Sequence, residues 1–145
     1  MDFALAVAIA ARAYGENRDE GGRFFLARAL DVAVALEPTA SSTALSTAVL
    51  YRIPIDTHWP FEHLAVVGTD PVVSEAVDAL MQRRGESYVE YVRRVCAARG
   101  RAGETARSVL AAELRLGIVQ TDSDALRERY ESSLPLIQGA LATVD

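Results

Sequence analysis

Residues 48–57 read Ala-Val-Leu-Tyr-Arg-Ile-Pro-Ile-Asp-Thr, and this stretch decides how the chain can be interpreted. Its apolar beginning continues a helical pattern that opens at the serine pair 41–42, a residue type that caps helix N-termini. Pro54 has no backbone N–H and cannot continue that helix, so we expect the helix to end at Arg52 or Ile53. The polar residues of the stretch therefore fall at a helix end and in the bend that follows: Tyr51, Arg52 and Asp56.

Helical periods separated by short breakers run through the rest of the chain. The Gly-rich polar segment 15–22 is typical of a loop, and Asp70 followed by Pro71 is a strong signal for a helix start. We find no repeat, low-complexity tract or linker, and expect one domain over residues 1–145. The pattern predicts an all-α bundle of about eight helices with short connections. The expected helices span residues 3–14, 23–36, 42–52, 61–67, 71–84, 87–98, 104–119 and 123–142.

The composition excludes several classes of function. The chain has 145 residues, a net charge of −5 and 15 basic residues, all of them Arg. The negative charge argues against a nucleic-acid partner, and the absence of Lys excludes Schiff-base chemistry and a P-loop lysine. A single cysteine, Cys96, permits neither an internal disulfide nor a Cys-based zinc cluster. No apolar stretch is long enough to span a bilayer, so we expect a cytoplasmic protein with no membrane partner.

Residues 48–57 resemble the metal-site helix of HD-domain phosphohydrolases, which usually reads Ala-Leu-Leu-His-Asp-Val-Val-Glu-Asp-Thr. The resemblance covers nearly the whole chain and is greatest to the branch that hydrolyses the alarmone guanosine tetraphosphate. Residues 13–21 resemble that branch's Ala-His-x-Gly-Gln-x-Arg-Lys-x-Gly, residues 28–33 its His-Pro-Leu-x-Val-Ala, and residues 109–114 its Val-Lys-Leu-Ala-Asp-Leu. Residues 73–95 are close to the run that precedes its last metal ligand. The resemblance implies a single HD-domain-like helical bundle.

The resemblance also implies that the defining chemistry of the family is missing here. Members of the family hold one divalent metal through two His and two Asp side chains. This chain has Tyr51 and Arg52 at the His-Asp pair, Arg28 at the other His and Glu113 at the last Asp. Tyr keeps its proton to about pH 10 and Arg is permanently charged, so neither is an ordinary metal ligand. We expect no metal and no cofactor, and the register leaves Ala27 beside Arg28 as a competing replacement for that His.

Arginine side chains at these positions indicate what has replaced the metal. Guanidinium groups match carboxylates bidentately, so we expect Arg28 and Arg52 to neutralise Glu113 and Asp56. Arg18 fits the family position that contacts the nucleotide. With donors to spare, Arg18, Arg28 and Arg52 would form a pocket for a small anionic or polar ligand. The alternative is that these side chains only hold helices together.

Three residues are candidates for metal-independent proton transfer: Asp56, His58 and Tyr51. Because His titrates near neutral pH, Asp56 and His58 are a candidate acid–base pair. The alternatives are that Asp56 caps the turn after Pro54 and that His58 is an exposed loop residue. Tyr88 and Tyr91 match a stretch that lies near the nucleotide in the family. We expect them either to line the same cavity or to pack in the core.

Three classes of function follow from the sequence. The first is a degenerate, metal-free HD-domain protein whose cavity binds a small anionic or polar ligand. Such a protein is either a pseudoenzyme with a regulatory role or an enzyme repurposed for metal-independent chemistry in a specialised pathway. The second is a metal-dependent nucleotide or alarmone phosphohydrolase with atypical ligands, and the third is a protein-interaction module. A homodimer is left open as a further partner.

Overall fold

The computed structural model describes residues 1–36 and 38–142. Within these ranges the chain is built from helices and connecting turns, which confirms the predicted all-α class. The helices in chain order are α1 (Phe3–Tyr14), α2 (Phe25–Val34), α3 (Ser42–Leu50), α4 (Ile53–Asp56), α5 (Phe61–Val66), α6 (Pro71–Ala79), α7 (Tyr88–Ala97), α8 (Gly100–Gln120) and α9 (Asp124–Ala142). None of these described helices is long and apolar enough to cross a membrane.

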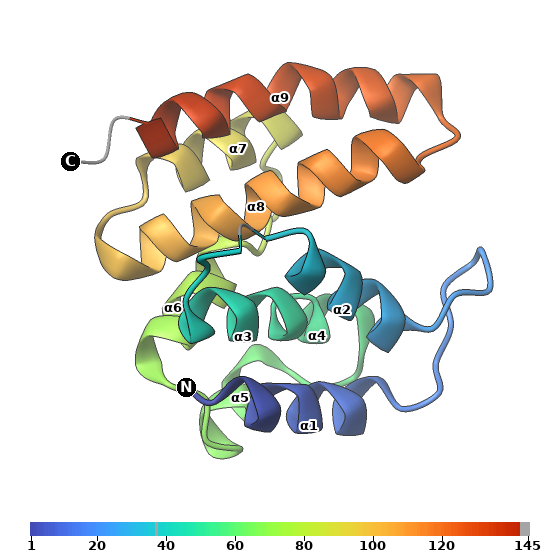
Figure 1. Cartoon of the computed structure of the whole chain (residues 1–145), viewed down its shortest axis with the longest axis vertical. Coiled ribbons are helices and arrows are strands. Elements are labelled where there is room, and N and C mark those ends of the chain that lie inside the picture. The colour runs from blue at the N-terminus through green and yellow to red at the C-terminus, as the bar shows by residue number, and fades with distance from the viewer. Residues whose placement is uncertain (37, 143–145) are drawn as a thin grey trace.

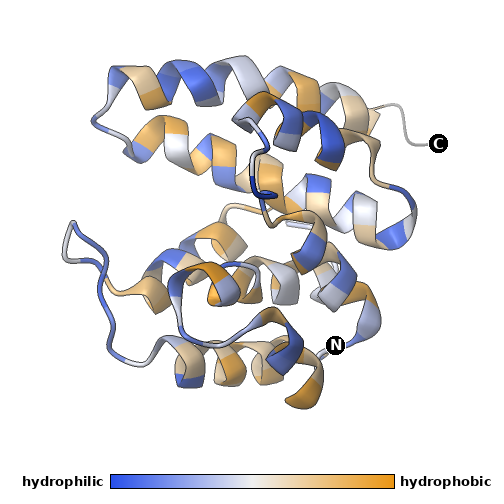
Figure 2. Ribbon diagram, turned by 180° about the vertical axis from the view of Figure 1, so that it is seen from behind, coloured by the Kyte–Doolittle hydropathy of each residue, from blue (hydrophilic) through white to orange (hydrophobic). Residues whose placement is uncertain are grey.

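The helices are arranged in two layers that meet along α8 (Figure 1). Helices α7, α8 and α9 form one layer, and α1 to α6 form the other. The four consecutive residues 109–112 of α8 are all at most 1% exposed, because α8 packs against α2, α3, α6, α7 and α9. A helix that is apolar on every side belongs in a core, and Figure 2 shows apolar residues along the middle of α8. The core thus fixes the position of Glu113, one residue further along.

The bend expected after Arg52 is in fact one more turn of helix, α4. Proline fits the first turn of a helix, where its missing N–H has no partner to lose, and Pro54 occupies that place. The N–H groups of Ile55 and Asp56 both donate to the carbonyl oxygen of Arg52, at 3.0 and 2.8 Å. The result is that Asp56 lies one turn beyond Arg52, and both side chains point the same way.

Two other helix ends differ from the expected ones by more than two residues. Helix α8 begins at Gly100 rather than at Glu104, because the chain uses Gly103 for a close approach: a Cβ there would lie 2.2 Å from the carbonyl oxygen of Ala98. Helix α6 ends at Ala79, short of residue 84. The Arg94 side chain of α7 donates hydrogen bonds to the carbonyl oxygens of Ala79, at the end of α6, and of Met81, just beyond it, both at 2.9 Å. Those hydrogen bonds replace a further helical turn.

Asp70 occupies the N-cap position predicted before α6, but its side chain does not cap the helix. Asp70 has the extended backbone of an N-cap, and its side chain makes no capping hydrogen bond. Its carboxylate instead pairs with the amino group of Met1 at 2.6 Å. The ion pair joins the start of α1 to the start of α6.

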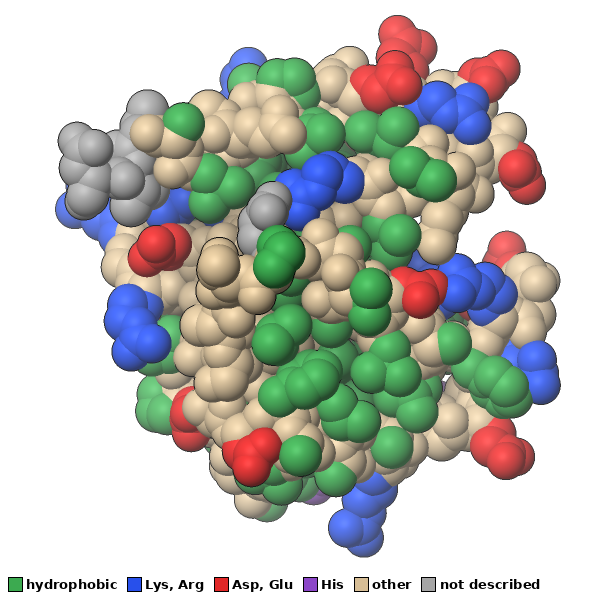
Figure 3. Space-filling view, viewed as in Figure 1, with side chains coloured by type: hydrophobic (Ala, Val, Ile, Leu, Met, Phe, Trp, Pro, Cys, Tyr) green, Lys and Arg blue, Asp and Glu red, His purple; other side chains and the backbone are tan. Residues whose placement is uncertain are grey.

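One face of the layer that contains α1, α2 and α3 carries many apolar side chains (Figure 3). Val34 in α2 is 83% exposed and Leu5 in α1 is 46% exposed. Exposed apolar surface of this kind is where self-association is commonly found. The homodimer stays a prediction.

Candidate ligand-binding site

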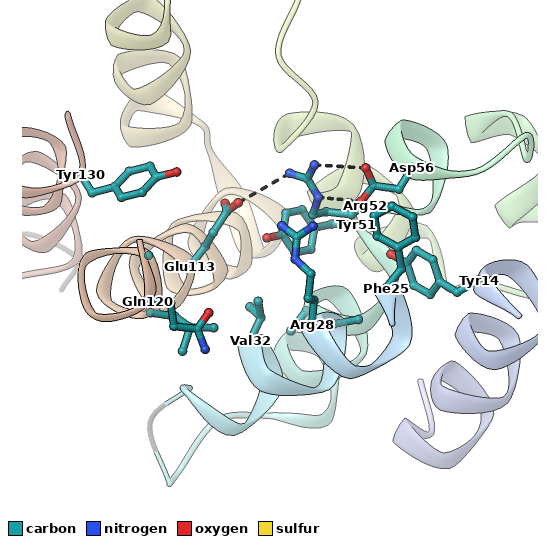
Figure 4. A pocket seen from close by; sticks show the side chains of 14 residues that line it. Tyr14, Phe25, Arg28, Val32, Tyr51, Arg52, Asp56, Glu113, Gln120 and Tyr130 are labelled. Atoms are coloured by element: carbon teal, nitrogen blue, oxygen red, sulfur yellow. Dashed lines mark hydrogen bonds and ion pairs between the residues drawn. The ribbon is translucent and has the colours of Figure 1, made fainter. Parts of the chain in front are cut away.

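A pocket opens where α2, the α3–α4 junction, α8 and α9 converge (Figure 4). The cavity has a volume of about 100 Å³. Its walls are partly apolar, through side chains such as Phe25, Val32 and Leu116. The polar and charged side chains that line it are Tyr14, Arg28, Tyr51, Arg52, Asp56, Glu113, Gln120 and Tyr130.

Arg52 bridges two carboxylates in this pocket. Its Nε and Nη2 donate to the two carboxylate oxygens of Asp56 at 2.8 and 3.2 Å, a bidentate arrangement. Its Nη1 lies 3.7 Å from Oε1 of Glu113. Burial lowers the pKa of Arg52, but the hydrogen bond to Asp56 and the charge of Glu113 outweigh it and raise that pKa. Arg52 therefore stays charged and acts as the internal counter-ion of both acids.

Glu113 is the less well neutralised of the two carboxylates. Burial raises its pKa above the ordinary value, and the charge of Arg52, the Tyr51 hydroxyl and the charge of Arg28 only partly oppose that rise. Its nearest cationic atom is the Arg52 nitrogen at 3.7 Å, beyond hydrogen-bonding distance. About a third of the side chain, 32%, remains accessible, and Glu113 is part of the pocket lining. The Glu113 carboxylate can therefore accept further hydrogen bonds from a ligand.

Tyr51 brings a buried hydroxyl to the same place. The residue is 2% exposed, and its hydroxyl lies beside Glu113 without a well-formed hydrogen bond to any described residue. Figure 4 shows that hydroxyl on the side of the pocket that Glu113 occupies. Burial and then the charge of Glu113 raise the pKa of Tyr51 well above 10.0. The group therefore stays a protonated phenol, which both donates and accepts a hydrogen bond.

Arg28 lies nearer the solvent, with 40% of its side chain exposed. Its Nη1 is 3.4 Å from Oδ2 of Asp19 in the loop between α1 and α2. That loop is held by an antiparallel bridge between Arg18 and Phe24. Arg28 belongs to the pocket lining, whereas Ala27 does not. Which of the two replaces the family His stays open.

The structure brings together five of the residues singled out from the sequence: Arg28, Tyr51, Arg52, Asp56 and Glu113. It places Arg18 elsewhere. The Arg18 guanidinium stacks on the ring of Phe24 at 3.7 Å and donates to the carbonyl of Gly22 at 2.8 Å, so it stabilises its own loop. His58 is exposed after α4, and the Asp56 carboxylate faces Arg52, so a hydrogen-bonded Asp56–His58 pair does not form. The proposed cap by Asp56 is likewise replaced by this ion pair.

Tyr88 and Tyr91 lie outside the pocket lining, with Tyr91 in the hydrophobic core and Tyr88 packed against it. Their rings are 5.8 Å apart, and the Tyr91 hydroxyl donates to the carbonyl of Leu80 at 3.0 Å. Burial and then the charge of Glu113 raise the pKa of both. Of the two roles expected for them, packing is the one that their contacts describe.

Three polar lining residues were not among the expected ones: Tyr14, Gln120 and Tyr130. One glycine in the sequence marks the place where Tyr130 packs. Gly117 lies inside the long helix α8, and a Cβ there would lie 2.8 Å from the ring of Tyr130. A glycine inside a helix often marks such a close approach, but the sequence does not show which residue approaches.

The donor set of the pocket does not fit a divalent cation. Such ions need several oxygen or imidazole donors converging on one point. Within residues 1–36 and 38–142, no group of three or more His, Cys, Asp or Glu side chains is arranged to hold a metal. Arg52 places a permanent positive charge between the two pocket carboxylates, which repels a second cation.

No family model and no curated protein sequence matches this chain. Among solved structures, it is similar to a metazoan ortholog of SpoT that hydrolyzes ppGpp and plays a role in starvation responses. The TM-score is 0.70 at 17% sequence identity, over 99% of this chain and 86% of that chain. An identity this low shows the fold alone. The chain has an HD-like helical fold, and the expected likeness to an alarmone hydrolase is confirmed at that level.

Proposed function

We propose that this HD-like protein uses its pocket to bind a small polar ligand with an acidic group, without a metal ion. The observation that carries the proposal is the place of Arg52, whose guanidinium bridges Asp56 and Glu113. Because Arg52 is held between Asp56 and Glu113, the second guanidinium of the pocket, Arg28, is the one available to a ligand, with a single ion pair to Asp19 at 3.4 Å. Arg28 then receives the acidic group of the ligand.

Binding is better supported than proton transfer. Both carboxylate oxygens of Asp56 accept hydrogen bonds from Arg52, so neither faces a substrate freely. The raised pKa of Tyr51 keeps its proton in place at neutral pH. A sensor or regulator needs only ligand binding, so we favour a regulatory pseudoenzyme over a repurposed enzyme.

The experiment is a thermal-shift titration of the full chain with inorganic phosphate, acetate and malonate. We expect at least one of them to raise the melting temperature of the wild type, because a ligand that binds only the folded state stabilises it. Arg28→Gln should lose the shift, and Arg12→Gln, a change of an exposed arginine in α1, should keep it. Equal shifts in the wild type and Arg28→Gln would contradict the proposal.

The second candidate is a metal-dependent alarmone phosphohydrolase, and the observation that favours it is the fold shared with a protein that hydrolyzes ppGpp. It is tested by incubating the purified chain with manganese and guanosine tetraphosphate and measuring pyrophosphate release. Turnover that a chelator abolishes would favour this candidate over ours. If no small molecule binds, the third class, a protein-interaction module, is favoured.

A further inference from the structure

We propose that the ligand of this pocket is a small zwitterion, of the α-amino-acid class, whose carboxylate meets Arg28 and whose ammonium meets Glu113. The inference rests on the proposed function, because it takes Arg28 as the anchor of an acidic group. It adds a second, oppositely charged group on the ligand and assigns that group to Glu113.

The charges of the pocket support this assignment. Two guanidinium groups and two carboxylates line it, so it is neutral as a whole: Arg28, Arg52, Asp56 and Glu113. Arg52 and Asp56 satisfy each other through two hydrogen bonds at 2.8 and 3.2 Å. The remaining pair is poorly satisfied, since Glu113 has its closest cation at 3.7 Å and Arg28 has only Asp19 at 3.4 Å. One positive and one negative group thus face the same cavity with capacity to spare (Figure 4).

The buried hydroxyl of Tyr51 lies beside Glu113 and can accept one more hydrogen bond. The residue is 2% exposed and lines the cavity, and its oxygen accepts no hydrogen bond from a described residue. An unpaired polar group in such a place is costly, and buried polar groups are nearly always satisfied. An ammonium group has three donors. One of them reaches Glu113, another reaches the Tyr51 oxygen, and the phenol proton remains free for the Glu113 carboxylate.

A ligand with only one charge fits this arrangement less well. A simple carboxylate would pair with Arg28 and add a negative charge beside Glu113 and Asp56. A simple amine would pair with Glu113 and add a positive charge beside Arg52 and Arg28. A zwitterion leaves the net charge of the pocket unchanged and gives both Arg28 and Glu113 a partner of opposite charge. The apolar walls beside them, formed by Phe25, Val32 and Leu116, suit a short apolar side chain.

The test is an NMR titration of the ¹⁵N-labelled full chain, following the amide of Gly117, which lines the pocket. The probes are the common L-amino acids one at a time, with propionate, ethylamine and inorganic phosphate as references that carry charge of one sign only. We expect at least one amino acid to bind about tenfold more tightly than propionate and ethylamine, the factor that one charge-assisted hydrogen bond contributes. Glu113→Gln, which keeps the size of the side chain, should remove that preference and leave propionate binding intact. Arg28→Gln should weaken both.

The outcomes separate this inference from the proposed function. If propionate or phosphate binds as tightly as every amino acid, and binding depends on Arg28, the zwitterion is overturned while the acidic-ligand pocket stands. A preference for an amino acid that survives in Glu113→Gln also overturns it. If no probe shifts the Gly117 amide, the proposed function and the inference fall together. Glu131→Gln, a charge removal on the exposed face of α9, is the matched control and should behave as the wild type.

Discussion

Replacing Asp56 by Asn should destabilise the fold, because it removes the main partner of Arg52. The pair is joined by hydrogen bonds of 2.8 and 3.2 Å, with 33% of the Arg52 and 14% of the Asp56 side chain exposed. Breaking a fully buried pair costs about 3–5 kcal/mol and breaking an exposed pair about 0–1 kcal/mol. This pair lies between the two limits, so we expect a loss of about 2 kcal/mol. For a chain of this length that is a drop in melting temperature of about 4–8 °C.

The assay is urea denaturation followed by circular dichroism, with the melting temperature as a second readout. Asp124→Asn is the matched control, since it removes the partner of Arg127 from an ion pair in which Asp124 is 99% exposed. We expect that control to change the free energy of unfolding by less than about 0.5 kcal/mol. A loss at Asp56 no larger than in the control would refute the view that Arg52 and Asp56 form the internal counter-ion pair of this site.

Three further predictions concern the residues around that pair. Glu113 has a raised pKa in the folded state, so the folded chain holds its proton more tightly than the unfolded chain, and ionising it destabilises the fold. Urea denaturation at a series of pH values should therefore show the wild type losing stability relative to Glu113→Gln as the pH rises above about 4.3, the ordinary carboxyl value. A constant difference between the two across the series would contradict this. Tyr51→Phe removes an unsatisfied buried hydroxyl, and its free energy of unfolding should stay equal to that of the wild type or rise by about 1 kcal/mol; a clear loss would mean that the hydroxyl has a partner. Asp19→Asn removes the competing counter-ion of Arg28 while keeping an acceptor for the Arg23 amide, so malonate should bind more tightly to it in a calorimetric titration, and weaker binding would count against the role given to Arg28.

Most of the fold could be predicted from the sequence, because local signals set it. The serine at position 41 caps α3 by accepting from the Ala44 amide at 3.1 Å, and Ser87 caps α7 in the same way from the Glu90 amide. The ends that were mispredicted depend on distant groups. Helix α6 ends where Arg94 of α7 takes its carbonyls, and α8 begins early because Gly103 packs against Ala98. Such tertiary contacts leave no local pattern in the chain.

The site was only partly visible in the sequence for a similar reason. Arg28, Arg52 and Glu113 could be proposed together because a family resemblance aligned them. Their mutual geometry depends on how α2, α4 and α8 pack. Nothing local showed that α4 turns Asp56 back towards Arg52, or that α9 brings Tyr130 against Gly117. Those two facts decide which polar groups pair with one another inside the protein and which remain available to a ligand.

The central claim is that a guanidinium group occupies the position where a cation would be held. The most direct test is an electron paramagnetic resonance titration of the purified full chain with manganese, with bound and free ion counted separately. We predict no manganese bound in proportion to protein, in the wild type or in Asp124→Asn. One manganese held per chain, and lost when Glu113 is changed to Gln, would contradict the account.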